Sequence, residues 1–421
     1  TAHAQAFTHP DLVRAIAEAH PHGASAHRLR VLAAGISTDP RVAHLPGDPG
    51  GTARYTTHEL LQVEARGLRL AREGAGRGHH HAHTASLQQA IDTHAHALTD
   101  EQQRLAETVA RGVDRVGVVI GAAGAGKTTA IQAATRALQH DGIPVTGLAP
   151  SANAAHQLQH HAGIPADTLH AALANPDRHI PTDGVLVIDE ASMADTRTLT
   201  SILTHARERD TRVVMVGDPL QLPAVGPGGL FAAIAAERDA VSLEANNRQT
   251  NTWERDALRD LRHGRTLQAL TAYATHGRIH IQDTIPELHQ RIGEDWWHTH
   301  QAHPDQTVVM LAHTNHDIRE LNQQARAHMH AHGRLGPDTP IGGLRLAVGD
   351  AVVLKRNDRE HGLRNGTRAT ITHITHEAIT ARAVDDGTLH IPRGYAERGP
   401  AGVDVHAGFD AQPFAESRAD S

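Results

Sequence analysis

Short apolar runs alternate with helix-length amphipathic segments through the middle of the chain. Four of these runs have the length and composition of buried strands, at residues 116–120, 144–148, 185–188 and 213–216. Such runs, separated by segments long enough for a helix, are typical of a parallel sheet. The pattern predicts an α/β domain over residues 98–250.

The first 97 residues have a different texture, because His, Ala and Gly dominate them. Thr57 is placed to cap a helix that Gly74 ends. The low-complexity stretch at 74–83, GAGRGHHHAH, is typical of a linker. We therefore expect residues 1–97 to form a helical, low-complexity accessory region and linker.

Residues 251–421 show a weaker α/β pattern that predicts a second lobe. Its elements are a helix at 253–261, a strand at 307–311 and a helix at 317–328. Residues 344–391 then contain short strands separated by turn dipeptides, which predicts a small β-barrel-like insert in this lobe. The tail at 398–421 has no periodicity, so we expect it to be disordered.

Composition excludes several classes of protein. With 39% hydrophobic and 21% charged residues, the 421-residue chain is unlike a membrane protein or a fully disordered chain. No apolar run reaches the roughly 18 residues of a membrane span, and no signal peptide is recognisable, so we expect an unexported, cytoplasmic protein. The absence of cysteine excludes disulfides, Cys-ligated zinc and thiol nucleophiles. A net charge of -7 leaves the choice of partner open.

Lysine is scarce, because only Lys127 and Lys355 are lysines among 40 basic residues. Lys127 lies in a match to the P-loop pattern G-x-x-x-x-G-K-[ST], between a strand-like run and a helix-competent run. In such a loop, backbone N–H groups wrap phosphates, the lysine reaches the β- and γ-phosphates, and the Thr128 hydroxyl binds Mg²⁺. We assign nucleotide contacts to Gly121, Gly124, Ala125, Gly126, Lys127, Thr128 and Thr129.

An acidic pair, Asp189 and Glu190, follows the buried-type strand at 185–188. The carboxyl ends of parallel strands are where ligands bind in open α/β sheets. We expect Asp189 to hold Mg²⁺ and Glu190 to orient or deprotonate the attacking water. The alternative interpretation is a solvated pair that begins a helix.

Six further segments of the sequence resemble motifs of a known protein family. They are LTDEQ at 98–102, APSANAA at 149–155, TLH at 168–170, GDPLQLPAV at 217–225, NRQ at 247–249 and the pairs Gly349-Asp350, Asn357-Asp358 and Asn365-Gly366. In this order they resemble RecD-like superfamily 1 helicases, and most closely the helicase region of MobF-type conjugative relaxases. The phrase YTTHELL at 55–61 and the run at 311–322 strengthen the narrower resemblance.

The resemblance implies roles for individual residues. Gln102 would read adenine, Gln221 would couple the phosphate state to the DNA-binding surface, and Arg248 would act as a finger on the γ-phosphate. An arginine suits the last role because its planar fork matches phosphate oxygens. The segments at 149–155 and 168–170 would contact the single-strand backbone.

For the whole chain, the resemblance implies ATP-driven movement from 5′ to 3′ along single-stranded DNA. Two RecA-like lobes with parallel sheets would close on ATP and Mg²⁺, and the β-rich insert would belong to the second lobe. Single-stranded DNA and other proteins of the conjugation machinery would be the partners.

One expected motif departs from the family pattern. Tyr395-Ala396 resembles its start, but Glu397 to Pro400 replaces the rest, and no Gln-Gly pair follows. We expect a truncation or frame change after Tyr395. The alternative function is accordingly a degenerate remnant that binds ATP or DNA without unwinding.

Histidine is abundant, with 37 residues, and several occur as His-x-His pairs, such as His79, His81 and His83. A metal site needs a third ligand and supporting hydrogen bonds, which the sequence does not identify. A His-dependent metal nuclease is therefore the last-ranked of the alternatives.

Overall fold

The computed structural model divides the chain into two units, residues 1–272 and 273–421. It describes residues 6–20, 22–46, 52–94, 98–122, 124–222, 224, 226–238, 240–243, 249–304, 306, 308–358, 360–383, 387–397 and 403–405. The division falls between Ala272 and Tyr273, so α12 (Thr252–Arg262) and the start of α13 (Thr266–Thr275) belong with the first unit.

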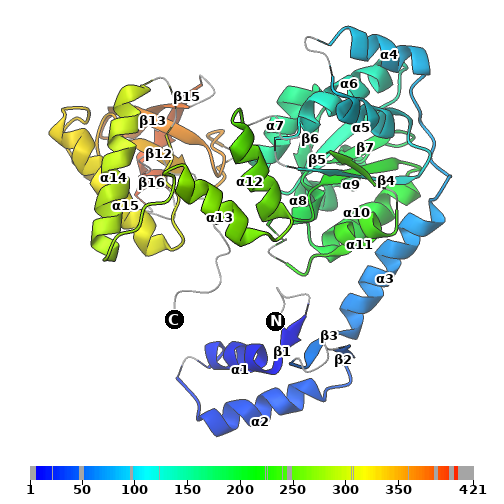
Figure 1. The fold of residues 1–421 in the computed structure, drawn as a ribbon, viewed down its shortest axis with the longest axis horizontal. Coiled ribbons are helices and arrows are strands. Elements are labelled where there is room, and N and C mark those ends of the chain that lie inside the picture. Colours follow the sequence, from blue (N-terminus) through cyan, green and yellow to red (C-terminus); the bar gives the residue numbers. More distant parts are fainter. Residues whose placement is uncertain are drawn as a thin grey trace. The chain divides into compact units, whose positions relative to one another are not determined.

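A six-stranded parallel sheet forms the centre of the first unit (Figure 1). In spatial order its strands are β6 (Ala166–Thr168), β5 (Val145–Ala149), β7 (Val185–Ile188), β8 (Arg212–Gly217), β4 (Val116–Gly121) and β9 (Val241–Leu243). All five neighbouring pairs are parallel, so the carboxyl ends of the strands share one edge. The four predicted strands are confirmed to within one residue at each end, and so is the α/β class.

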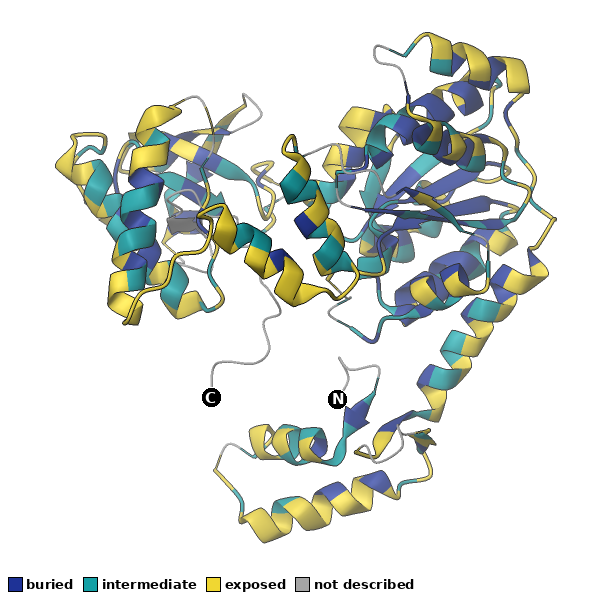
Figure 2. Ribbon diagram, viewed as in Figure 1, coloured by how far each residue is buried: buried dark blue, intermediate teal, exposed yellow. Residues whose placement is uncertain are grey.

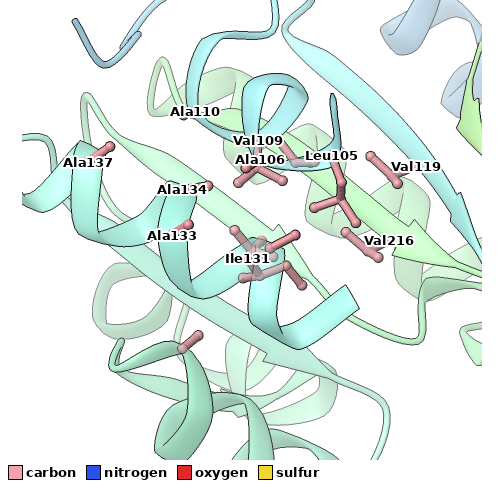
Figure 3. Packing of buried hydrophobic residues seen from close by; sticks show 14 of the residues in the cluster. Leu105, Ala106, Val109, Ala110, Val119, Ile131, Ala133, Ala134, Ala137 and Val216 are labelled. Carbon is pink, nitrogen blue, oxygen red and sulfur yellow. The ribbon is translucent and has the colours of Figure 1, made fainter. Parts of the chain in front are cut away.

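Helices cover both faces of this sheet because alternate strand residues point to opposite sides. One face carries α4 (Thr84–Asp92), α5 (Asp100–Arg111), α6 (Lys127–His140) and α7 (Ala152–Ala162). Figure 3 shows Leu105 of α5 beside Val119 and Val216 of the sheet, with Ile131 of α6 close by. The other face carries α3 (His58–Glu73), α8 (Leu169–Ala174), α10 (Thr196–Glu208) and α11 (Leu230–Ala236).

The accessory region is more ordered than a linker. Thr57 caps α3 as predicted, since its hydroxyl accepts a hydrogen bond from the backbone N–H of Leu60. The stretch at 74–83 is hydrogen-bonded to the end of α5 and the residues after it: Gly78 N–H donates to Val113 O, and Ala82 N–H donates to Ala110 O. Ala82 is buried. The preceding residues form β1 (Phe7–Thr8), α1 (His9–Glu18), α2 (Ala26–Ser37), β2 (Val42–Leu45) and β3 (Arg54–Thr57).

The second unit combines a helix pair with antiparallel sheets. The pair is α14 (Ile285–Ala302) and α15 (Asn315–Ala331), which share a core around Trp296, Trp297 and Leu321. A two-stranded sheet joins β10 (Thr339–Ile341) to β11 (Leu344–Leu346). A five-stranded sheet follows in the order β15 (Thr388–Pro392), β14 (Ala378–Ala383), β13 (Arg368–Ile374), β12 (Ala351–Leu354) and β16 (Val403–Val405).

Two predictions for this unit are wrong for residues that the structure describes. No strand forms at 308–311; instead Val308 O accepts a hydrogen bond from Trp296 Nε1, and Met310 is buried against the helix pair. The tail was expected to be disordered, yet Val403–Val405 is strand β16, because its extended backbone pairs with the edge of β12. The other tail residues from 398 onward, together with residue 307, lie outside the described residues. Every strand pair described in this unit is antiparallel, so a second parallel sheet is not among them.

The remaining short helices are α9 (Pro176–His179), the 3-10 turn η1 (Ala191–Met193) and α16 (Arg393–Ala396). Among the residues that the structure describes, no helix is both long and apolar enough to cross a membrane.

Candidate nucleotide site

The P-loop connects β4 to α6, as the sequence predicts. Gly124 and Gly126 have φ angles of 79° and 78°, in the left-handed region that favours glycine. Gly126 is the N-cap of α6, so the backbone N–H groups of the first turn face the loop. This arrangement is suited to an anion such as a nucleotide phosphate.

Lys127 is buried at the start of α6, with 9% of its surface exposed. Its Nζ donates to Gly121 O at 3.1 Å and lies 3.5 Å from Glu190 Oε1. A Cβ atom at Gly121 would lie 2.5 Å from Lys127 Cδ, so only glycine leaves room for the lysine stem. The ammonium is thus held between the loop and the acidic pair.

Gln102 is also brought to the loop, from the N-terminus of α5. It forms a capping box with Thr99, whose N–H donates to Gln102 Oε1 at 3.0 Å. Its Nε2 donates to Ala125 O at 3.3 Å, and a Cβ atom at Gly126 would lie only 2.1 Å from that nitrogen. Gln102 therefore packs directly against the P-loop backbone.

The acidic pair follows β7 at the same edge of the sheet. Burial, together with the neighbouring Glu190 carboxylate, raises the pKa of Asp189 to about 6, although the Lys127 ammonium opposes the rise. Glu190 has a φ of 50°, a strained conformation for a residue with a side chain. Its Oε2 is buried and has no hydrogen-bond partner among the described residues. A buried carboxylate oxygen without a partner is suited to accept a hydrogen bond from a bound water.

A second acidic group lies after β8. Asp218 is 1% exposed and pairs with both terminal nitrogens of Arg262, at 2.5 and 2.9 Å. Burial alone would raise the pKa of Asp218, but the hydrogen bonds and charge of Arg262, together with the hydrogen bonds from Leu220 N–H and Gln221, outweigh it and the pKa is lowered. Gln221 Nε2 donates to the same carboxylate at 3.4 Å.

A hydrogen bond joins this segment to the acidic pair, because Asp218 N–H donates to Ser192 Oγ at 3.2 Å. Ser192 follows Glu190 in η1. No pattern in the sequence marks Arg262 as the partner of Asp218. A buried acidic residue after a strand signals that a cation is needed, but the pattern does not tell which of many arginines supplies it.

The other predicted residues are placed as follows. Thr128 and Thr129 lie partly exposed in the first turn of α6. Ser151 and Thr168 cap α7 and α8 at the carboxyl ends of β5 and β6. The segments at 149–155 and 168–170, which the resemblance assigns to the backbone of single-stranded DNA, therefore lie at the same sheet edge as the P-loop. Arg248 lies outside the described residues.

The histidine pairs that the sequence singled out do not form a metal cluster among the described residues. The group closest to one consists of His80, Asp183 and Asp210. Asp210 and Asp183 precede β8 and β7, so they lie at the sheet edge opposite to the P-loop. Arg115 pairs with the Asp210 carboxylate at 3.0 Å, and His80 Nε2 lies 3.0 Å from the Asp210 backbone carbonyl, so two of the three groups already have a partner within the protein.

Comparison with known proteins adds independent findings. Residues 97–284 match the model of an AAA domain family. A probable conjugal transfer protein TraA from Sinorhizobium fredii is 33% identical over 78% of this chain, which spans about 30% of that protein's length. An ATP-dependent RecD2 DNA helicase from Deinococcus radiodurans is 27% identical over 64% of this chain and 38% of its own length. A crystal structure of Pif1 helicase from Bacteroides with ADP-AlF3 and single-stranded DNA is 20% identical, with a TM-score of 0.46 over 70% of this chain and 75% of that one.

A P-loop at the carboxyl edge of a parallel sheet, with an acidic pair directly after a nearby strand, defines a P-loop nucleotide-binding protein of the α/β class. Within that class, the AAA domain match together with the conjugal transfer and RecD2 relatives supports the helicase region of a conjugative relaxase, of the RecD-like superfamily 1 type.

Proposed function

We propose that the chain is an ATP-driven motor that moves from 5′ to 3′ along single-stranded DNA. The observation that carries the proposal is the meeting of Lys127 and Glu190 at 3.5 Å, beside Asp189, at the carboxyl edge of the sheet. A cation for phosphate, a base for water and a carboxylate for Mg²⁺ are the parts that phosphoryl transfer needs. The resemblance supports the direction of movement, and the RecD2 DNA helicase relative supports DNA as the partner.

The residues present fit ATP and Mg²⁺. The left-handed glycines shape a loop that a phosphate would occupy, and the unpartnered Glu190 Oε2 leaves an acceptor for a water. Thr128 and Asp189 would hold Mg²⁺, which would neutralise charge on the β- and γ-phosphates when bound. With a pKa near 6, Asp189 is mostly ionised at neutral pH, as a metal ligand must be.

Each side chain then has one task. Lys127 binds the β- and γ-phosphates, and Gly121, Gly124, Ala125, Gly126 and Thr129 contribute the loop and helix start around them. Glu190 orients the attacking water and accepts its proton. Gln102 contacts the adenine end, and Arg248 stabilises the γ-phosphate charge in the transition state.

Gln221 would pass the phosphate state onward; its sharing of Asp218 with Arg262 and the hydrogen bond from Asp218 to Ser192 support this role. A chain of contacts thus connects the acidic pair after β7 with α12. A shift at the γ-phosphate would reach α12 through these groups.

The DNA strand would be held through its backbone rather than by base stacking. Eight Trp, Tyr and Phe residues are described: Trp253 and Tyr273 are half-buried, and the other six are buried, namely Trp296, Trp297, Tyr55, Tyr395, Phe7 and Phe231. Without exposed aromatic platforms from these residues, arginines and loop N–H groups must supply most of the affinity. We therefore expect DNA binding to depend strongly on salt and little on sequence.

The test is ATP hydrolysis with and without oligo(dT), for the parent chain, Lys127→Ala and Glu190→Gln. We expect DNA-stimulated turnover in the parent, a loss of at least about 100-fold in both variants, and retained ATP binding in Glu190→Gln. Displacement of streptavidin from a 3′-biotinylated but not a 5′-biotinylated strand would support the direction. ATP binding without turnover in the parent would contradict the motor and favour the degenerate remnant. Metal-dependent DNA cleavage that is indifferent to Lys127→Ala would favour the nuclease.

A further inference from the structure

Residues 6–57, here called the N-terminal module, have a topology of their own. A short strand β1 precedes two consecutive helices, α1 and α2, and a β2–β3 pair follows, in a three-stranded antiparallel sheet of order β1-β3-β2. Phe7, Leu12, Ala33 and Tyr55 form its core. Two helices followed by a β-hairpin that pairs with a preceding strand is the arrangement of a winged helix, in which the second helix reads DNA.

Helix α2 is packed on one side only (Figure 2). Of its twelve residues, Ala33 and Ser37 alone are buried. The opposite face presents His27, Arg28 and Val31, all exposed, and 56% of the surface of Val31 is accessible. The face around Val31 is therefore accessible to a partner.

The charge on α2 indicates the kind of partner. The helix contains Arg28 and Arg30 but no acidic residue. Among the described residues, neither guanidinium has an ion-pair partner, whereas Arg41 in the same module is paired with Asp39 at 2.9 Å. Free arginines on a helix without acidic residues attract phosphates.

Gly35 supports a close approach to α2. It lies exposed in the helix interior, one turn beyond Val31, and a Cβ atom there would meet nothing within 4 Å. Glycine lowers the stability of a helix interior, and packing inside the module does not require it here. A bare backbone on the exposed face lets a surface approach the helix more closely than a side chain would.

We propose that the N-terminal module binds duplex DNA, with α2 in the major groove. Arg28 contacts a phosphate or a guanine edge and Val31 contacts a thymine methyl group, whereas Arg30, two positions from Arg28 and so on another side of the helix, contacts a phosphate. This is a second DNA site, separate from the single-strand path of the proposed motor and independent of ATP. It would place the motor beside double-stranded DNA while the other site holds one strand.

The test measures binding of the full chain, without ATP, to a closed DNA dumbbell of about two helical turns that has no single-stranded end. We compare the parent, Arg28→Ala/Arg30→Ala and a control, Arg66→Ala/Arg69→Ala, which removes the same charge from exposed positions on α3. We expect at least tenfold weaker binding for the α2 variant, with a salt slope shallower by about 2, and less than twofold change for the control.

A second variant, Gly35→Leu, separates surface contact from charge. It adds a side chain to the exposed face and improves helix propensity, so we expect a folded chain that binds the dumbbell at least fivefold more weakly. DNA-stimulated ATP hydrolysis should be unchanged in the α2 variants, and Lys127→Ala should keep duplex affinity. Equal losses in the α2 and α3 double variants, or no duplex binding by the parent, would overturn the proposal whether or not the motor function holds.

Discussion

Arg262 of α12 donates two hydrogen bonds to the Asp218 carboxylate, at 2.5 and 2.9 Å, and Asp218 is almost completely buried. The pair joins the segment that follows β8 to a helix more than forty positions later in the chain. Because the same carboxylate also accepts from Gln221, the pair fixes the residue that we propose to pass on the phosphate state.

Arg262→Ala should destabilise the chain by about 3 kcal/mol, because it leaves the Asp218 carboxylate buried with its main partner removed. Arg259→Ala is the matched control on the same helix, since Arg259 pairs with Asp256 where both side chains are exposed, and it should cost less than about 0.5 kcal/mol. Urea denaturation measures both. Equal midpoints for the two variants would contradict the structural role of Arg262.

Gly126→Ala should impair the loop in two ways. Any side chain there is strained at a φ of 78°, and its Cβ would lie 2.1 Å from Gln102 Nε2. Gly142 has a similar φ of 73°, but a Cβ atom there would meet nothing within 4 Å. Gly142→Ala therefore measures the cost of backbone strain alone, about 1 kcal/mol. We expect Gly126→Ala to lose more stability than Gly142→Ala and to raise the Kd for ATP at least tenfold, measured by titration. Identical behaviour of the two variants would argue against packing between Gln102 and the loop.

The raised pKa of Asp189 predicts a pH-dependent stability. Its pKa is about 6 in the folded state against an ordinary 3.8, so between these values the folded chain binds a proton that the unfolded chain has released. This contribution to stability is present at low pH and is lost as the pH rises through 6.

Asp189→Asn removes the titrating group, so its stability relative to the parent should increase from about pH 4.5 to pH 7 and then stay constant. A two-unit shift corresponds to about 3 kcal/mol, and we expect about 1 to 2 kcal/mol because the side chain is partly exposed. Denaturation in Mg²⁺-free buffer over this range measures the difference in the free energy of unfolding between Asp189→Asn and the parent. A difference that decreases with rising pH would contradict the proposed environment of Asp189.

Glu190 has a left-handed backbone, with a φ of 50°, that favours glycine. Glu190→Gly should therefore be more stable than Glu190→Ala by about 1 kcal/mol. At Glu107, an exposed residue inside α5, the order should reverse, because alanine is the better helix former by about 1 kcal/mol. Thermal unfolding of the four variants checks both signs, and both Glu190 variants should fail to hydrolyse ATP. The same order at the two positions would show that the Glu190 backbone relaxes.

Local patterns in the sequence determined the core of the first unit. The strand at 185–188, the P-loop before Lys127 and the Thr57 cap are each encoded within about ten residues, by apolar runs, glycines and a capping hydroxyl. Because parallel strands bring their carboxyl ends to one edge, the sequence also predicted that the Asp189-Glu190 pair lies at the ligand-binding edge of the sheet, where the structure brings Lys127 Nζ to 3.5 Å from Glu190.

Tertiary structure decided what depends on partners far along the chain. The apolar run at 308–311 forms no strand; the Val308 carbonyl accepts a hydrogen bond from Trp296 Nε1 instead of a strand partner. The tail residues 403–405 form a strand because the edge of β12 is free to pair with them. Arg262 is important only because α12 lies against the buried Asp218. Hydrophobic periodicity reports which face of an element is buried, but hydrogen-bond and ion-pair partners are chosen by packing between distant segments, which only the folded chain brings together.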